Sequence, residues 1–291
     1  MSAIQKIHIN DDLAKRLIRL QFPQWQHLRI QAVKQSGWDN RTFHLGDDMS
    51  IRLPSDEEYA PQILKEFKWL PILAQGLSAQ ITTPIALGLP CKEYPWHWSI
   101  NKWLEGEPSS VESINDMNQF AMQLGRFLNE FHQIDATGGP PAGEHNFYRG
   151  GALSAYDDEM RKAIPLIQNP EVKNLVEQLW NEAISSFWKE GPVWVHGDIA
   201  VGNLLVKQGA LSAIIDFGQL AIGDPACDLA ITWNLFTGDS RKVFRSSLPL
   251  DRDTWVRALG WTLWKALCWP IKGTDVKRII NDVLKDFSSI A

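Results

Sequence analysis

Three residues in the second half of the chain have side chains that suit phosphoryl transfer from a nucleotide. They are Asp198, Asn203 and Asp216, and the last of them begins the sequence Asp-Phe-Gly. Such a transfer needs a carboxylate that receives the proton of the attacking hydroxyl, and oxygen ligands that hold Mg²⁺ on the phosphates. The residue types and their spacing predict that Asp198 is the catalytic carboxylate and that Asn203 and Asp216 bind Mg²⁺.

A β-hairpin is predicted between Asn203 and Asp216. Residues 204–206 and 213–215 are short apolar runs typical of strands, and a turn that contains glycine separates them. The open end of this hairpin would bring Asn203 and Asp216 together, with Asp198 on the loop just before it. A single Asp often has a structural role in a turn. The combination of the three residues with a hairpin favours chemistry over that alternative.

The sequence around these residues resembles a known family. HGDxxxxN followed by IDFG and then GDPxxDLA is similar to the aminoglycoside phosphotransferase and choline kinase-like group, which shares the protein-kinase fold. Protein kinases carry Arg after the His of this loop, whereas small-molecule kinases use Gly, as Gly197 here. The family commonly has His-Pro or Gly-Pro in the middle of the loop, where this chain has Ala200-Val201. That difference alters loop stiffness and leaves the three chemical residues in place.

The resemblance implies an α+β fold, the two-lobe protein-kinase-like fold, which has an N-terminal antiparallel sheet with a helix and a mainly helical C-terminal lobe. We expect residues 1–104 to form the N-terminal nucleotide-binding lobe and residues 105–291 the C-terminal catalytic and substrate-binding lobe. The spacing of apolar residues agrees with this division. It predicts strands over 28–33, 42–45, 49–53 and 98–103, and helices over 11–21, 56–74, 117–134, 171–188, 226–236, 253–269 and 276–287.

Asp224 and Pro225 predict the start of the helix over 226–236, because Asp is a favoured N-cap and Pro is favoured in the first turn. Asp228 then lies in that first turn. The family resemblance implies that Asp228 is a structural brace, whose carboxylate accepts backbone N–H groups from the loop of His196.

The phosphates of the nucleotide have two candidate contacts in the first half of the chain, Ser36 and Arg52. Ser36 lies in a predicted turn between the first two strands, which would cover the phosphates; a plain hairpin turn is the alternative. Arg52 occupies the place where protein kinases carry a phosphate-binding Lys. Glu66, on the following helix, is its expected partner, because a guanidinium can bond a carboxylate and a phosphate together. The alternative is that Arg52 and Glu66 are unrelated surface residues.

The connection between the lobes is predicted at residues 103–108, where Gly and Pro let the chain pass from one lobe to the other. By resemblance to the family, an adenine would lie there against apolar side chains. It would bond to the Lys102 carbonyl and the Leu104 amide. The donor is ATP or GTP.

The acceptor is expected to be a small hydroxylated molecule, with an aminoglycoside or related antibiotic as the lead. Two alternatives stay open: a kinase of a metabolite such as choline, a sugar or an amino alcohol, and a regulatory nucleotide-binding pseudokinase. Carboxylates would bind an amine-rich acceptor, and an aromatic cage would bind a quaternary amine. The residues of those kinds near predicted loops are Tyr156, Asp157, Asp158, Glu159, Trp233, Asp239, Trp261 and Trp264.

Composition excludes other classes of protein. A net charge of −5 argues against a nucleic-acid partner, since such proteins are usually basic, and it fits a cationic acceptor. The three cysteines, Cys91, Cys227 and Cys268, have no metal-like spacing and predict buried thiols. No apolar run approaches the roughly 20 residues that span a bilayer, and no signal-peptide pattern opens the chain. We therefore expect a cytoplasmic protein without a membrane partner.

Overall fold

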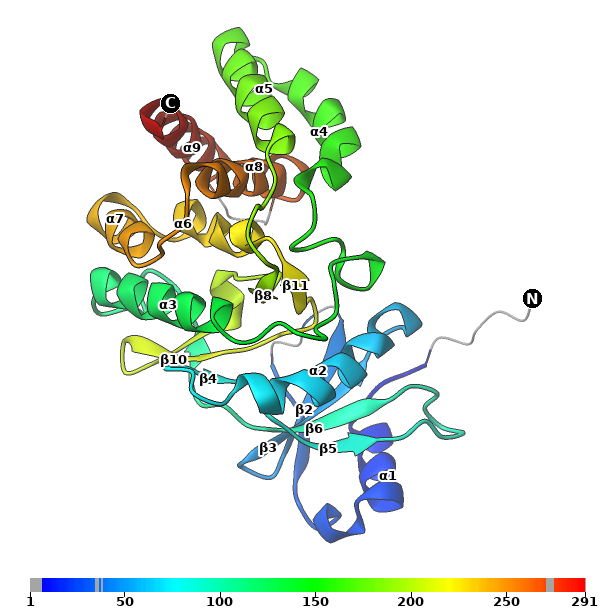
Figure 1. Cartoon of the computed structure of the whole chain (residues 1–291). Helices are drawn as coiled ribbons and strands as arrows, with labels where there is room; N and C mark the ends of the chain where they lie inside the picture. Colours follow the sequence, from blue (N-terminus) through cyan, green and yellow to red (C-terminus); the bar gives the residue numbers. More distant parts are fainter. Residues whose placement is uncertain (1–6, 35–36, 38, 271–274, 291) are drawn as a thin grey trace, which may run out of the picture. The chain divides into compact units, whose positions relative to one another are not determined.

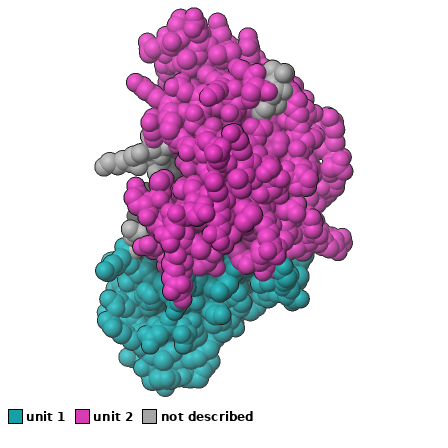
Figure 2. All heavy atoms as spheres, turned by 90° about the vertical axis from the view of Figure 1, so that its left-hand side faces the viewer, with its two compact units in different colours: residues 1–76, 80–105, 213–218 teal, residues 77–79, 106–212, 219–291 magenta. Residues whose placement is uncertain are grey.

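A computed structural model of the chain describes residues 7–34, 37, 39–270 and 275–290. The chain forms two compact units, which Figure 2 colours separately. Unit 1 comprises Met1–Gly76, Gln80–Glu105 and Ala213–Gly218, and unit 2 comprises Leu77–Ala79, Gly106–Ser212 and Gln219–Ala291.

Unit 1 is built on a five-stranded antiparallel sheet with the strand order β1-β2-β3-β6-β5 (Figure 1). Its strands are β1 Ile30–Ala32, β2 Asn40–Leu45, β3 Met49–Pro54, β5 Pro84–Gly88 and β6 Trp98–Lys102. A further short strand, β4 Gln80–Ile81, pairs in parallel with the end of β10. Two helices, α1 Asp11–Gln21 and α2 Ala60–Leu73, complete the unit.

The alternation of residues along β3 explains how unit 1 presents a charged side chain beside a core. Successive strand residues point to opposite faces of a sheet. Ile51 and Leu53 are fully buried in the cluster that also contains Leu17 of α1. Arg52, between them, therefore points to the other face, where it meets Glu66 of α2.

Unit 2 is mainly helical (Figure 1). Its helices are α3 Met117–His132, α4 Asp157–Ala163, α5 Pro170–Ser185, α6 Ile231–Asn234, α7 Gly238–Ser246, α8 Arg252–Cys268 and α9 Val276–Ile290. Its strands are β7 Glu107–Pro108, β8 Val193–Val195, β9 Leu204–Lys207, β11 Ala221–Gly223 and the first part of β10 Ala210–Ile214. Most of α8 is buried, because it packs against α4, α5 and α9.

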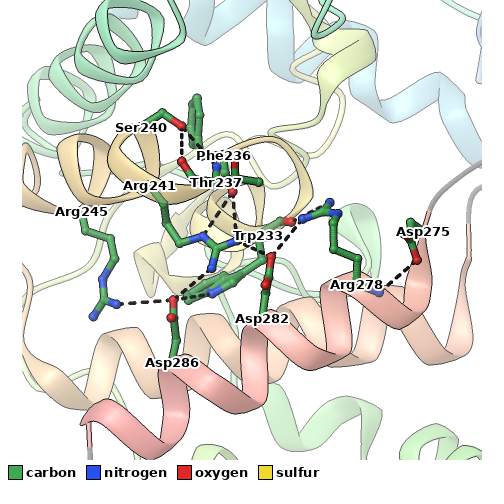
Figure 3. A network of polar contacts seen from close by, with 10 residues as sticks. All are labelled: Trp233, Phe236, Thr237, Ser240, Arg241, Arg245, Asp275, Arg278, Asp282 and Asp286. Carbon is green, nitrogen blue, oxygen red and sulfur yellow. Dashed lines mark hydrogen bonds and ion pairs between the residues drawn. The ribbon is translucent and has the colours of Figure 1, made fainter.

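A polar network attaches α9 to the segment around α6 and α7 (Figure 3). Arg241 donates hydrogen bonds to the Phe236 carbonyl and, at 2.6 Å, to Asp282. The Trp233 indole donates to Asp286 at 2.9 Å. Two carboxylates on successive turns of α9 therefore bind partners from outside that helix.

The predicted fold class is confirmed: an antiparallel N-terminal sheet with helices precedes a mainly helical C-terminal part. The predicted helix over 226–236 is wrong in detail. The chain forms a 3-10 helix, Pro225–Ala230, then the short α6, and then α7. Asp224 is the N-cap as expected and accepts from Ala226 N. The helix α7 was not foreseen, because Gly238 at its start looks like a helix breaker in the sequence.

Within the ranges that the structure describes, no helix is both long and apolar enough to span a membrane.

Candidate active site

Arg52 joins two carboxylates within unit 1. Its Nη1 donates to Glu66 Oε2 at 2.7 Å, and its Nη2 donates to Asp216 Oδ1 at 3.1 Å. The Arg52 side chain is 11% exposed and the Asp216 side chain is 41% exposed. Burial alone would lower the pKa of Arg52, but the charges of Glu66 and Asp216 raise it above its usual value. The expected ion pair of Arg52 with Glu66 is present, and the contact with Asp216 adds a second partner.

Arg52 stabilises the ionised carboxylate of Glu66. Its side chain is 2% exposed, and burial raises the pKa of its carboxyl while Arg52 opposes that shift. Among the described residues, no group donates a hydrogen bond to its Oε1. Loss of Arg52 would therefore leave a buried carboxylate without a counter-charge.

The Asp216-Phe217-Gly218 segment follows β10 with an unusual backbone. Asp216 has φ of 67°, a left-handed conformation that is uncommon for a residue other than glycine and that is often found at functional sites. Phe217 is fully buried. A Cβ on Gly218 would lie 2.5 Å from Gln62 Oε1 of α2, so a larger residue there would have to displace the end of the Gln62 side chain. Burial of Phe217 therefore anchors the chain directly after the exposed Asp216 carboxylate.

The chain at the start of the predicted lobe connection is ordered by backbone hydrogen bonds within unit 1. Lys102 N donates to the Thr83 carbonyl at 2.9 Å, and Trp103 N donates to the Asp48 carbonyl at 2.8 Å. Leu104 is buried, and its N–H donates to no other described residue. This amide fits the predicted contact with an adenine. Ser36, the other predicted phosphate contact, lies outside the described residues.

In unit 2, the loop after β8 is held by one buried carboxylate. Asp228 accepts the backbone N–H groups of His196 at 2.7 Å and of Gly197 at 2.8 Å. This confirms the brace that the family resemblance implied. Gly197 has φ of 84°, and a Cβ there would lie 2.6 Å from the Gln219 carbonyl oxygen. Glycine is therefore required between His196 and Asp198.

Both oxygens of the Asp198 carboxylate have partners in unit 2. Lys265 Nζ of α8 lies 3.1 Å from Oδ1. Asn203 Nδ2 donates to Oδ2 at 3.3 Å and to the Asp198 backbone carbonyl at 2.9 Å. These contacts orient the carboxylate and direct the amide nitrogen of Asn203 towards it. They leave the oxygen of Asn203 for another ligand.

Asp198 lies among positive charges. Burial alone would raise its pKa, but Lys265, and after it Arg149 and His196, hold the pKa below its usual value. The side chain is 36% exposed. Asp198 is therefore an ionised and reachable carboxylate at neutral pH, as a proton acceptor must be.

Arg149 and Lys265 were missed in the sequence. Arg149 is 9% exposed, and its guanidinium carbon lies 4.4 Å from the ring centre of Trp264 and 5.3 Å from that of Trp261. Its Nε donates to Gln219 Oε1 at 3.1 Å. The loop over 145–151, which contains Arg149, had no assigned role. Lys265 gave no local signal, because a lysine on an amphipathic helix usually faces solvent.

Most of the acidic and aromatic residues suggested for the acceptor have structural partners instead. Asp157 accepts from the Trp180 indole at 2.7 Å, and Glu159 accepts from the Trp264 indole at 2.8 Å. Only Tyr156, Trp261 and Trp264 gather around Arg149. The others lie apart in other roles: Asp158 in the first turn of α4, Trp233 buried against α9, and Asp239 in an exposed ion pair with Lys242.

The donors available for a metal suit Mg²⁺. Asp216 Oδ2 and Asn203 Oδ1 accept no hydrogen bond from a described residue. Among the described residues, no three His, Cys, Asp or Glu side chains gather into a metal-binding group. Mg²⁺ prefers oxygen ligands, so the carboxylate oxygen of Asp216 in unit 1 and the amide oxygen of Asn203 in unit 2 are each of a type that suits it.

Comparison with known proteins places these residues in a family. The model of the phosphotransferase enzyme family, APH, matches residues 30–267. An aminoglycoside 3'-phosphotransferase of Escherichia coli is 31% identical over 141 residues, which are 45% of this chain and 46% of the relative. The chain thus matches about half the length of this curated relative.

Solved structures share the fold. The GDP and kanamycin complex of APH(2")-IIia has a TM-score of 0.70 at 18% identity, covering 95% of this chain and 97% of that one. The macrolide 2'-phosphotransferase of Brachybacterium faecium has a TM-score of 0.64 at 18% identity, covering 93% and 98%. The resemblance found in the motifs is confirmed, and because the family model spans most of the chain, this protein belongs to the phosphotransferase enzyme family.

Proposed function

We propose that the protein transfers the γ-phosphate of ATP or GTP to a hydroxyl group of a small molecule. The observation that carries this proposal is the Asp198 carboxylate, which Lys265 and Asn203 orient on a loop braced by Asp228. An Asp with a purely structural role would not need a carboxylate that is both ionised and accessible to a ligand. Membership of the phosphotransferase enzyme family supports the same reaction class.

The nucleotide is assigned to residues 1–104, the proposed nucleotide-binding lobe. Arg52, oriented by Glu66, would neutralise the phosphates through its planar fork of donors. The Lys102 carbonyl and the Leu104 amide would bond the base, and Ser36 would donate to a phosphate. One of the similar solved structures is a complex with GDP, which agrees with a nucleotide donor here.

Mg²⁺ is assigned to Asn203 and Asp216, which the motif spacing selects and whose free oxygens fit this ion. When bound, Mg²⁺ would supply positive charge to the phosphate oxygens. Asp216 also contacts Arg52, so its carboxylate is positioned next to the proposed phosphate-binding cation.

The acceptor is assigned to residues 105–291, the proposed catalytic and substrate-binding lobe, where Asp198 would act on it. The Asp198 carboxylate would accept a hydrogen bond from the acceptor hydroxyl and take its proton as the oxygen attacks the γ-phosphorus. The bond between the γ-phosphorus and the bridging oxygen breaks, and the nucleoside diphosphate leaves with that electron pair. Lys265 stabilises the ionised form of Asp198 before the transfer.

Two acceptor classes deserve testing. An aminoglycoside or related antibiotic is the first, because relatives of this family carry that name and one similar structure is a kanamycin complex. A small metabolite is the second. The positive charges of Lys265 and Arg149 near Asp198 favour a metabolite without ammonium groups. In either case we propose a cytoplasmic enzyme, because its nucleotide donor is available there. A regulatory pseudokinase would have no use for the complete set of Asp198, Asn203 and Asp216.

The test is transfer of labelled γ-phosphate by the purified protein to a panel of hydroxyl compounds, with and without Mg²⁺. We expect a phosphorylated product that requires Mg²⁺ and either ATP or GTP. Nucleotide binding without transfer to any compound, and without an effect of Asp198→Asn on slow nucleotide hydrolysis, would support the pseudokinase instead.

A further inference from the structure

The ammonium of Lys265 remains available to a ligand after it pairs with Asp198. Its Nζ lies 3.1 Å from Asp198 Oδ1, and its side chain is 17% exposed. A lysine has three N–H donors, and the contact with Asp198 accounts for one of them. An acceptor hydroxyl that approaches Asp198 would therefore also meet Lys265.

A second positive charge packs against the helix that carries Lys265. Arg149 lies against the rings of Tyr156, Trp261 and Trp264, and its field acts on Asp198. Its Nη1 is buried without a hydrogen-bond partner among the described residues, and its guanidinium carbon lies 4.4 Å from the ring centre of Trp264. The three aromatic rings confine the Arg149 side chain, so its positive charge stays at this position in unit 2.

The backbone before Arg149 is strained in a way that serves its placement. Phe147 and Tyr148 have φ of 53° and 55°, which is uncommon for aromatic residues. Asn146 Nδ2 donates to the Arg149 carbonyl at 2.7 Å and to the Gln219 carbonyl at 3.1 Å. These hydrogen bonds hold the loop in place, while Phe147 and Tyr148 are 37% and 42% exposed.

Three carboxylates of unit 2 that could have bound an amine already have partners. Glu159 accepts from the indoles of Trp264 and Trp269, at 2.8 and 3.0 Å. Asp224 is paired with the buried Arg257 at 2.6 Å. Asp228 is fully buried and faces backbone amides. An amine that bound any of these three carboxylates would have to displace a partner within the protein, whereas Lys265 keeps donors for a ligand.

We propose that the acceptor is a neutral or anionic hydroxyl compound, and that Lys265 excludes acceptors with an ammonium group beside the reacting hydroxyl. This inference rests on the proposed phosphotransferase function and narrows its substrate class. An ammonium next to the hydroxyl would lie close to Lys265, whose side chain is only 17% exposed, and like charges repel more strongly there than in bulk water. A carboxylate or a hydroxyl there would accept a hydrogen bond from Lys265.

The experiment compares acceptors that differ only in charge. The probes are uncharged sugars and polyols, each with its amino and its acidic derivative, such as glucose, glucosamine and glucuronate, together with kanamycin. We expect kcat/KM for each amino derivative to be about tenfold or more below that of its uncharged counterpart. Lys265→Met should reduce this ratio and Lys265→Arg should keep it. Lys242→Met, in an exposed ion pair, is the matched control and should change neither rate nor ratio.

The result that would overturn the inference is preferred phosphorylation of kanamycin or of the amino derivatives. The inference would also be overturned if the protein binds Mg²⁺-nucleotide but phosphorylates none of the uncharged or acidic compounds. A ratio unchanged in Lys265→Met, with the thermal midpoint of the variant preserved, would remove Lys265 from the selection. Failure to bind nucleotide at all would instead refute the proposed function on which the inference rests.

Discussion

Arg52 and Glu66 form a buried ion pair in unit 1, with Arg52 Nη1 2.7 Å from Glu66 Oε2. The same guanidinium reaches Asp216 at 3.1 Å through Nη2. One arginine thus connects the sheet, the helix α2 and the Asp-Phe-Gly segment. Its planar guanidinium donates to two carboxylates at once, which a lysine ammonium does less well.

The first prediction concerns this pair. Arg52→Ala should weaken nucleotide use severely, and Arg52→Lys should recover only part of the loss. Glu66→Ala should resemble a weaker Arg52→Ala, since it removes the orientation and keeps the charge. Because the two residues belong to one network, their effects should be non-additive. The measurement is kcat/KM for the nucleotide in a double-mutant cycle.

Stability provides an independent control for that cycle. Arg52→Ala leaves Glu66 buried without its counter-charge, so we expect a loss of about 3–5 kcal/mol in the free energy of unfolding. Arg41→Ala removes an exposed arginine from the neighbouring strand and should cost less than about 1 kcal/mol. A double mutant whose loss equals the sum of the single losses would contradict the pairing.

The second prediction concerns the brace of the catalytic loop. Asp228→Asn keeps the size of the side chain but turns an amide N–H₂ towards one of the two N–H groups that Asp228 now accepts. We expect about 1–3 kcal/mol of destabilisation, since a buried donor loses its acceptor. Turnover should also fall while nucleotide affinity is kept. Unchanged turnover and thermal midpoint would show that Asp228 has no bracing role.

The third prediction concerns Mg²⁺. Asp216→Ala should abolish the Mg²⁺ dependence of nucleotide binding, because a carboxylate is the strongest oxygen ligand available. Asn203→Ala should be milder, since a neutral amide contributes less. Titration of nucleotide with and without Mg²⁺ measures both effects. Equal affinities for wild type and Asp216→Ala under both conditions, with normal turnover, would exclude the metal assignment.

Local sequence patterns predicted the parts of the site that depend on neighbouring residues. The hairpin between Asn203 and Asp216 is present, with Gln208 and Gly209 at φ of 54° and 81° in its turn, as a tight hairpin requires. Asp224 caps the helical segment that carries Asp228. These features depend on a few consecutive residues, so the sequence contains the whole signal.

Other parts depend on packing between distant segments and left no local signal. Lys265 reaches Asp198 from a helix whose spacing predicts only that it is amphipathic. The acidic run in the first turn of α4 gave no sign that Glu159 would accept from the indoles of Trp264 in α8 and of Trp269 at its end. Only the fold brings these groups together, so the charges around Asp198 could not be predicted from the sequence.

The fourth prediction concerns the attachment of α9 (Figure 3). Arg241 is 11% exposed and binds both the Phe236 carbonyl and Asp282. Arg241→Ala should therefore lower the free energy of unfolding by about 1–3 kcal/mol. Lys242→Ala, in an ion pair that is 80% and 79% exposed, is the control and should change it by less than about 0.5 kcal/mol. Equal effects of the two variants would show that the network does not hold α9.

The most direct test is a comparison of Asp198→Asn with the wild-type protein in nucleotide binding and in phosphate transfer to the same acceptor. Asn203 and Lys265 surround the side chain, so an amide of equal size keeps the shape of the site and removes the proton acceptor. We expect unchanged affinity for Mg²⁺-nucleotide and a loss of transfer on the order of 10²–10⁴-fold. Transfer at near the wild-type rate would show that Asp198 is not the catalytic carboxylate.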